Sequence, residues 1–446
     1  MPDESRRTAL PPRGEFVIHG VWLLSTDAAL GDFPAADIHV RDGNIVDVAP
    51  SLDAPGVARI DASGMIALPG FVDAHWHLWN SALRALVKSD DPREGYFPVT
   101  MRLGPLCTPE DAYRSVRLGL AEALASGITT VHDWSHNVRS AEHADAEIRA
   151  LSDMGVRARF SYGWGQDLPL ERAMNLEDLG RVAREVGAGS KCEGMLHLGA
   201  ALRTPVANPR GVVPIGVLCD ECAVIRSLGL PITMHARPGL VRLLHQHALL
   251  GSDLQLVHPQ GLSHEEIAQL AEAGTSFTTS PVIEMHYAQA TRGEIQFQEL
   301  EDAGVRQSLS VDSSAASANG DFFSCMRALL WSHKQRFGAR VPLGPRRLLE
   351  LATLDGARDL GIADRVGSIT PGKRADVILV RTTDANMAPM FDPAYALVYS
   401  AQPGNVDTVI VDGRILRRGG RFTFFDESDV VREATESVRA LARRAA

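Results

Sequence analysis

The feature that most constrains the fold is an alternation of short apolar runs with longer helix-like stretches between residues 66 and 360. Strands that alternate with helices favour a parallel sheet, and eight repeats of this unit favour a closed (β/α)8 barrel. The sequence therefore predicts an α/β protein built around a TIM barrel. The eight strand-like runs are Ile66–Asp73, Thr129–His132, Arg157–Tyr162, Met195–Leu202, Pro231–His235, Leu254–His258, Ser276–Thr279 and Gln307–Val311.

Both flanks of this region predict strands and turns. Asp42-Gly43 and Asp412-Gly413 lie between apolar runs and are hairpin signals. The simplest topology joins the strands of both ends into one small β domain beside the barrel. Near the C-terminus, apolar residues at helical spacing predict an amphipathic helix. The predicted divisions are residues 1–65 and 361–425 for the two parts of the β domain, 66–360 for the barrel, and 426–446 for the terminal helix.

Composition narrows the classes of function. Acidic residues outnumber basic ones by 55 to 45, and the net charge of −10 disfavours a nucleic-acid binder, which usually carries a basic surface. No apolar run approaches the roughly 20 residues of a membrane helix, and residues 1–15 are too polar for a secretory signal. With five scattered cysteines, this pattern favours a cytoplasmic protein that acts on a small molecule without membrane contact. Association into a homo-oligomer stays open.

A pair of histidines gives the first indication of chemistry. His75 and His77 follow the first run, in Pro69-Gly70-Phe71-Val72-Asp73-Ala74-His75-Trp76-His77. Side chains two apart on a strand point to the same side, and the carboxyl ends of barrel strands form the active-site face. Two imidazoles so placed can bind one divalent metal ion. Because this spacing also arises by chance, the argument needs further ligands.

Three more ligand-type residues stand at the ends of later runs. His235 ends the fifth run, His258 ends the sixth, and Asp312 follows the eighth. Buried histidine and aspartate are costly unless they are paired or bind a metal. Five such residues at one end of a barrel therefore favour a metal centre over separate structural roles.

These motifs resemble the amidohydrolase superfamily, in the branch that contains cytosine deaminase-like and triazine hydrolase-like enzymes. Gly127-Ile128-Thr129-Thr130-Val131 and the turn from Gly367 to Asp376 also match, and the similarity runs from about Phe16 to Leu416. The resemblance implies a distorted barrel with a β-sandwich built from both termini. It implies a hydrolase of carbon–nitrogen bonds other than peptide bonds. It further implies one zinc or iron ion held by His75, His77, His235 and Asp312, with His258 beside the bound water.

The lysines bear on the number of metal ions. Members of the superfamily with two metals use a carboxylated lysine at the end of the fourth strand. The chain has four lysines, and none closes the fourth run, which continues into Arg203-Thr204. One divalent ion is therefore expected, with zinc ahead of iron.

One position departs from the resemblance. Deaminases of this branch usually carry a glutamate three residues after the histidine of the fifth strand, where it transfers protons. Here that position is Pro238, which has no group for proton transfer. Glu284, just past the seventh run, is a candidate substitute, and the alternative is a solvated or helix-capping glutamate in the loop.

The residues suggest a mechanism and a pocket. A metal-activated water can give its proton to Asp312 and attack an sp² carbon of the substrate. His258 can polarise the substrate, and either Asp312 or Glu284 can protonate the leaving nitrogen. Loops after the strands should line the pocket, and their aromatic residues suggest a flat cyclic or heteroaromatic substrate. The candidate substrate-binding residues are Trp79, Asn80, Trp134, His136, Trp164 and His258.

We predict a metal-dependent hydrolase that deaminates a small cyclic substrate or hydrolyses its amide or lactam bond. Pro238 keeps an alternative open, a metal-dependent lyase, decarboxylase or cyclase, in which the metal holds the substrate and no water attacks. A binding protein without catalysis is disfavoured, because the set of metal ligands is complete.

Overall fold

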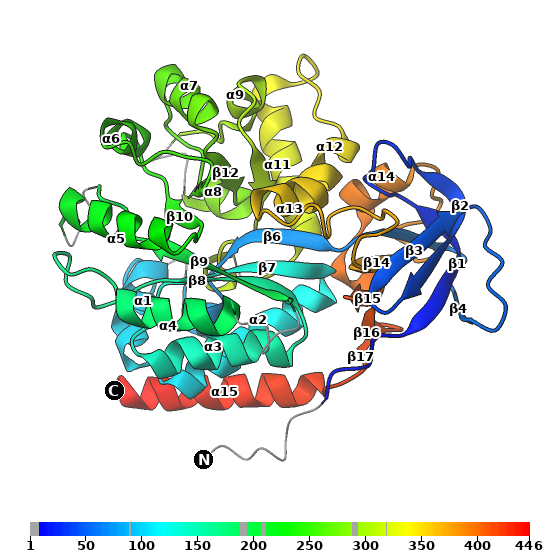
Figure 1. Cartoon of the computed structure of the whole chain (residues 1–446), viewed down its shortest axis with the longest axis horizontal. Coiled ribbons are helices and arrows are strands. Elements are labelled where there is room, and N and C mark those ends of the chain that lie inside the picture. Colours follow the sequence, from blue (N-terminus) through cyan, green and yellow to red (C-terminus); the bar gives the residue numbers. More distant parts are fainter. Residues whose placement is uncertain (1–8, 89–90, 188–193, 207–210, 288–292, 318) are drawn as a thin grey trace.

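A computed structural model describes residues 9–446, except residues 89–90, 188–193, 207–210, 288–292 and 318. An eight-stranded parallel sheet, in which β6 to β13 follow one another in chain order, confirms the predicted barrel (Figure 1). The sheet closes where the backbone N–H of Asp312 donates to the carbonyl of His75 at 2.9 Å. Its strands are β6 (Phe71–Trp76), β7 (Ile128–Ser135), β8 (Arg157–Tyr162), β9 (Leu196–Leu202), β10 (Ile232–His235), β11 (Leu254–Val257), β12 (Ser276–Thr279) and β13 (Gln307–Leu309).

The prediction of one strand over Ile66–Asp73 is wrong, because this run contributes to two strands. Met65–Pro69 (β5) pairs with strands of the terminal sheet, and the barrel begins at Phe71. Gly70 joins the two sheets, and a Cβ at this position would lie 2.1 Å from the side chain of Thr129. A glycine is therefore required where the chain passes from one sheet to the other.

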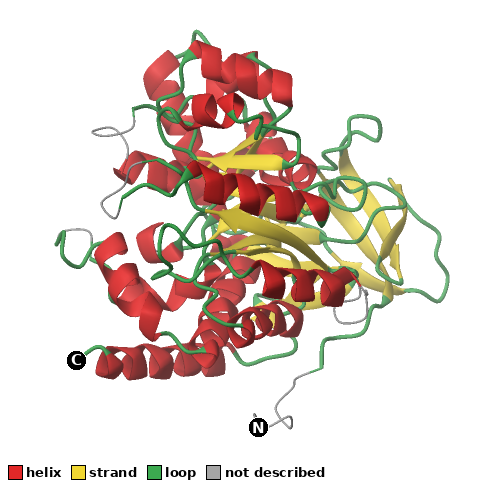
Figure 2. Ribbon diagram, turned by 60° about the vertical axis from the view of Figure 1, so that its left-hand side comes forward, coloured by secondary structure: helices red, strands yellow, loops and turns green. Residues whose placement is uncertain are grey.

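Helices surround the barrel (Figure 2). The predicted helix starts are confirmed, since Thr108 and Ser263 each form a capping box with the residue three positions later. A 3-10 helix, η2 (Leu78–Ala85), follows the first barrel strand. The α-helices up to the eighth barrel strand are α1 (Tyr96–Leu103), α2 (Pro109–Ala125), α3 (Ala141–Asp153), α4 (Leu176–Gly187), α5 (Ile215–Ser227), α6 (Leu240–Gln246), α7 (His264–Ala273), α8 (Pro281–Tyr287) and α9 (Phe297–Asp302). The later ones are α10 (Ser314–Ser317), α11 (Phe322–Phe337), α12 (Pro345–Glu350), α13 (Gly356–Asp359), α14 (Pro393–Tyr395) and α15 (Glu427–Arg444).

A second sheet contains strands from both ends of the chain. Its order is β17-β16-β15-β14-β5-β1-β2-β3, with β4 beside β1, and β5 pairs antiparallel with β14. Both predicted hairpin turns are present, since Asp42 and Gly43 have φ angles of 50° and 82°, and Asp412 and Gly413 of 54° and 73°. The strands are β1 (Glu15–Leu23), β2 (Phe33–Arg41), β3 (Asn44–Ala49), β4 (Ala58–Asp61), β5 (Met65–Pro69), β14 (Val377–Arg381), β15 (Val406–Val411), β16 (Arg414–Arg418) and β17 (Arg421–Phe422).

The terminal sheet lies at the amino ends of the barrel strands. Arg157, the first residue of β8, is fully buried and pairs with Asp376 at 2.8 Å. The carboxyl ends of the strands therefore face away from this sheet, and α15 runs along α2, where Arg117 pairs with Glu433 at 2.6 Å (Figure 1). We propose that the barrel, the terminal sheet and α15 correspond to the divisions expected from the sequence, except that β5 belongs to the terminal sheet and not to the barrel. Among the described helices, none has the length and apolar character needed to cross a membrane.

Candidate metal centre and substrate pocket

Four predicted ligands meet at the carboxyl end of the barrel. One ligand atom from each of His75, His77, His235 and Asp312 lies within 4.8 Å of the others. Oδ1 of Asp312 is 3.3 Å from Nε2 of both His75 and His77, and Nε2 of His77 is 3.3 Å from Nε2 of His235. Ligand atoms on a tetrahedral zinc at about 2.0–2.1 Å would stand about 3.3 Å apart, so this spacing fits one ion.

The protonation and hydrogen bonding of these histidines suit metal binding. Burial lowers the pKa of His75, His77 and His235 well below the usual value, which keeps the imidazoles neutral and able to bind a metal. Nδ1 of His77 donates to the carbonyl of Trp134 at 2.9 Å, which leaves Nε2 free to face the other ligands. Neither ring nitrogen of His75 has a hydrogen-bond partner among the described residues, an arrangement that a bound cation would satisfy.

The backbone around the ligands has unusual φ angles and is held by a buried carboxylate. Asp312 and His258 have φ angles of 71° and 72°, in a region that residues other than glycine rarely adopt. Asp73, fully buried, accepts hydrogen bonds from the backbone N–H groups of His75 and Val311, both at 3.0 Å. It thereby links the ends of the first and last barrel strands, next to the ligands His75 and Asp312. Asp73 was not predicted as a site residue, although an aspartate in the middle of an apolar strand is the signal that marks it.

His258 connects the ligand cluster to Glu284. Its Nε2 lies 3.6 Å from Oδ2 of Asp312, and its ring stacks on His235 with centroids 5.4 Å apart. Its Nδ1 lies 3.1 Å from Oε1 of Glu284, and the same oxygen accepts the backbone N–H of Ser280 at 2.8 Å. Glu284 is 2% exposed and lies in the first turn of α8, so it is not a solvated loop carboxylate. Its bond to the N–H of Ser280, directly before this helix, does match the helix-capping alternative. The structure therefore places Glu284 behind His258, as seen from the ligands.

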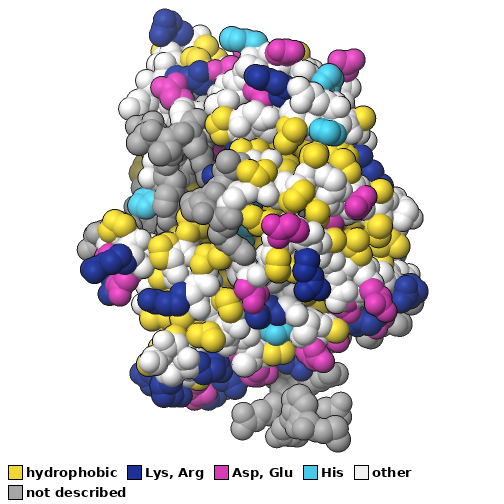
Figure 3. Space-filling model, turned by 90° about the vertical axis from the view of Figure 1, so that its left-hand side faces the viewer, with side chains coloured by type: hydrophobic (Ala, Val, Ile, Leu, Met, Phe, Trp, Pro, Cys, Tyr) yellow, Lys and Arg dark blue, Asp and Glu magenta, His cyan; other side chains and the backbone are white. Residues whose placement is uncertain are grey.

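A cavity of about 550 Å³ opens beside the ligand cluster, and His77, His235 and Asp312 line it. Trp134, His136 and Trp164 line it, as do His258 and Glu284. Trp134 is fully buried and lies edge-on to His77, with centroids 5.0 Å apart. Figure 3 views the molecule from the side to which the carboxyl ends of the strands point, and apolar side chains gather around the middle of this face.

Trp79 and Asn80 lie behind the cavity wall and are not among its lining residues. Nε1 of Trp79 donates to Nδ1 of His136 at 3.2 Å, so Trp79 orients a lining residue. Asn80 is fully buried, donates to the hydroxyl of Tyr96 at 2.9 Å, and accepts from the hydroxyl of Ser313 at 2.9 Å. It therefore connects the residue after Asp312 to helix α1.

Several lining residues were not predicted. Helix α1 contributes Tyr96, Phe97 and Met101, and Phe97 is 56% exposed at the mouth of the cavity. Arg237 lines the cavity two residues after His235, a spacing that could have indicated it, because a strand end there faces the pocket. Gln260 lies two residues after His258 and lines the cavity in the same way.

The model of the amidohydrolase family matches residues 66–416. A 5-methylthioadenosine/S-adenosylhomocysteine deaminase of Desulforudis audaxviator is 31% identical over 422 residues, which cover 91% of this chain and 94% of the relative. A 5'-deoxyadenosine deaminase of Methanosarcina mazei is 27% identical over 449 residues, covering 96% and 99%.

Solved structures share the fold. An adenosine deaminase from Xanthomonas campestris with bound zinc has a TM-score of 0.84 at 22% identity, covering 97% of this chain and 100% of that one. An atrazine chlorohydrolase from Arthrobacter aurescens in complex with zinc has a TM-score of 0.82 at 23% identity, covering 95% and 100%. At this level of identity, the similarity concerns the architecture alone.

Proposed function

The chain belongs to the amidohydrolase family and is a metal-dependent hydrolase of carbon–nitrogen bonds other than peptide bonds; from this premise, we propose that it removes an exocyclic amino group from a flat nitrogen heterocycle. The observation that carries the proposal is the cluster of four ligands beside a cavity walled by Trp134 and Trp164. Aromatic walls favour a flat substrate, and the ligand cluster favours attack by water at a carbon of the ring.

We propose one zinc ion, held by His75, His77, His235 and Asp312. The 3.3 Å spacing of the ligand atoms and their three nitrogens and one oxygen suit zinc. The fourth barrel strand ends at Leu202 and is followed by Arg203, so no lysine at this strand end could bridge a second ion. A divalent ion held there would lower the pKa of a coordinated water and so supply a nucleophile near neutral pH.

Asp312 is the proposed base. Its Oδ1 faces the histidine ligands, whereas Oδ2 lies toward His258 at 3.6 Å. Such a carboxylate can accept the proton of the attacking water while the rest of the cluster keeps it in place. Among the described residues that line the cavity, the other acidic side chain is Glu284.

We propose that Glu284 acts through His258 as a positioning residue. Its Oε1 binds Nδ1 of His258, which turns Nε2 of that ring toward Asp312 and the cavity. A carboxylate in this position stabilises a positive charge on the imidazole when the ring holds a proton for the leaving nitrogen. The pair thus provides the proton transfer that Pro238 cannot.

The relatives suggest which heterocycles to test. Curated relatives act on 5-methylthioadenosine, S-adenosylhomocysteine and 5'-deoxyadenosine, and the protein from Arthrobacter aurescens acts on atrazine. We therefore propose a substrate with an amino-substituted purine or triazine ring. The cavity of about 550 Å³ is large enough for a drug-sized ligand.

The test is release of ammonia by the zinc-loaded protein, with aminopurine nucleosides and aminotriazines as substrates. We expect ammonia and the hydroxylated ring in equal amounts, and loss of both when His75 is replaced by alanine. Carbon dioxide, or a ring that changes without uptake of water, would instead indicate the lyase or decarboxylase reaction.

A further inference from the structure

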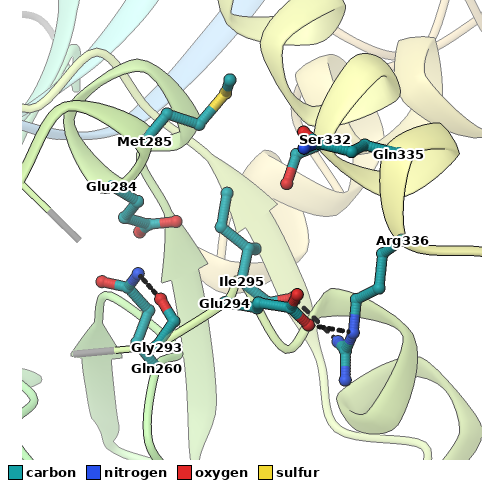
Figure 4. Close-up of a pocket in the computed structure, with 9 residues that line it drawn as sticks. All are labelled: Gln260, Glu284, Met285, Gly293, Glu294, Ile295, Ser332, Gln335 and Arg336. Carbon is teal, nitrogen blue, oxygen red and sulfur yellow. Dashed lines mark hydrogen bonds and ion pairs between the residues drawn. The ribbon is translucent and has the colours of Figure 1, made fainter. Parts of the chain in front are cut away.

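A second, smaller depression adjoins the metal-side cavity. It has a volume of about 250 Å³ and lies between helices α8 and α11 (Figure 4). Met285, Ser332 and Gln335 lie at its outer part, and Met285 is 41% exposed, so the depression opens to the surface. Its floor contains Gln260 and Glu284, each only 2% exposed.

Gln260 and Glu284 line both cavities. They therefore form a partition between the metal-side cavity of about 550 Å³ and the outer depression. Nε2 of Gln260 donates a hydrogen bond to the carbonyl of Gly293 at 2.8 Å. Oε1 of Glu284 accepts from the backbone N–H of Ser280 and lies within hydrogen-bond distance of Nδ1 of His258. These bonds leave Oε1 of Gln260 and Oε2 of Glu284 to be accounted for.

Oε1 of Gln260 and Oε2 of Glu284 are buried and have no hydrogen-bond partner among the described residues. Both atoms are acceptors, and one belongs to a carboxylate. Leaving buried acceptors without donors is costly, so the partition is suited to a small ligand that donates hydrogen bonds and carries positive charge.

The charges around the depression also favour a cation. Arg336 lies at its edge, but its guanidinium pairs with Glu294 at 2.7 Å and donates to Glu299 at 2.9 Å. Two carboxylates thus surround one guanidinium, and Glu284 adds a further carboxylate at the floor. An ammonium ion has only donors and a compact positive charge, which matches this acceptor set.

We propose that Gln260 and Glu284 form an exit site for the small amine product, taken as ammonium. This inference rests on the proposed function, in which water and an amino-substituted ring carbon give a ring carbonyl and ammonia. The ammonia then takes one proton from solvent and becomes ammonium. The larger heterocyclic product leaves through the mouth beside Phe97, whereas the amine crosses the partition into the outer depression.

The experiment uses ammonium chloride as the probe on the zinc-loaded protein, with sodium chloride at equal ionic strength as the reference. Because the exit site lies in the partition, and not between Trp134 and Trp164, which are proposed to hold the ring, ammonium should inhibit noncompetitively with respect to the heterocyclic substrate. Gln260→Leu removes one acceptor at similar size and should raise the inhibition constant for ammonium about 10-fold or more, as expected for a lost hydrogen bond to a charged group.

A second variant blocks the route without touching the partition. Ser332→Phe places a ring in the outer depression and should lower kcat several-fold with little change in KM, because release of the amine is slowed. The matched control is Val431→Phe on α15, where the residue is 49% exposed and far from the site in the fold. This control should retain both the wild-type kcat and the wild-type inhibition constant.

The outcomes separate this inference from the proposed function. If ammonia is released but ammonium inhibits competitively, and equally in wild type and Gln260→Leu, then the exit site is refuted and the deaminase proposal stands. If no heterocycle releases ammonia, the deaminase proposal fails. Ammonium binding is then read from the Tm of the zinc-loaded protein. A rise over sodium chloride that Gln260→Leu abolishes supports the site, and no rise refutes it.

Discussion

Replacing Glu284 with glutamine is the most informative single change. Glutamine keeps the size of the side chain, and its oxygen can still accept from Ser280 N and from Nδ1 of His258, which now lie 2.8 and 3.1 Å from Oε1. What disappears is the negative charge behind His258. The variant therefore isolates the electrostatic part of the proposed role from its packing.

The expected loss follows from the strength of that contact. A hydrogen bond to a charged group contributes about 1.5–3 kcal/mol, and each 1.36 kcal/mol of barrier is a factor of ten in rate. We expect kcat to fall by about 10- to 150-fold, with little change in KM, because the charge matters most when the imidazole carries the proton. Metal content should stay unchanged, since Glu284 touches none of the four proposed ligands.

The assay is steady-state ammonia release, with zinc measured in the same samples. Glu265→Gln is the control, because Glu265 is an exposed carboxylate in the first turn of α7. A double variant with His258→Asn should lose little more than His258→Asn alone, since the two residues act as a unit. A loss below 3-fold in Glu284→Gln, or losses that simply multiply in the double variant, would refute a role through His258.

Three other predictions concern the site and its support. Asp312→Asn should abolish turnover while zinc content falls less than in His75→Ala, because asparagine can still coordinate through oxygen but cannot accept a proton; turnover near wild type would exclude Asp312 as the base. Zinc at 100 times its Kd should stabilise the metal-free protein by about 2.7 kcal/mol, seen as a higher Tm, and this gain should vanish in His75→Ala. Burial raises the pKa of Glu147 on α3 from 4.5 to about 8, so the folded state holds a proton that the unfolded chain loses above about pH 4.5. Glu147 should then lower stability by up to about 1.4 kcal/mol per unit as pH rises from about 4.5 toward 8, and urea unfolding of Glu147→Gln should show a shallower slope, because burial also raises the pKa of Asp133 and Asp73.

The barrel and the position of the proposed ligands could be predicted from local pattern. Short apolar runs that alternate with helices specify a parallel sheet, and closure of such a sheet brings all carboxyl ends of its strands to one face. Residues at the ends of distant runs, such as His75, His235 and Asp312, are then neighbours whatever the details of the loops. The same reasoning anticipated the hairpin turns at Asp42-Gly43 and Asp412-Gly413, because their conformation depends on two residues.

Other features depend on contacts between segments far apart in the sequence. The division of Ile66–Asp73 into two strands results from the pairing of β5 with β14, more than 300 residues later. Trp79 lies in η2 behind the cavity wall and Phe97 lies in α1 at its mouth, and these positions depend on how both helices pack after the first barrel strand.

The partner of His258 was likewise decided by tertiary structure. The sequence showed that Pro238 leaves a proton-transfer group missing and that Glu284 lies past the seventh strand. Only the folded chain places Oε1 of Glu284 on Nδ1 of His258, and brings Glu284 and Gln260 together at the wall of both cavities. Strand order alone brings residues to the same face, whereas the position of a single carboxylate oxygen depends on the packing of α8 against the barrel.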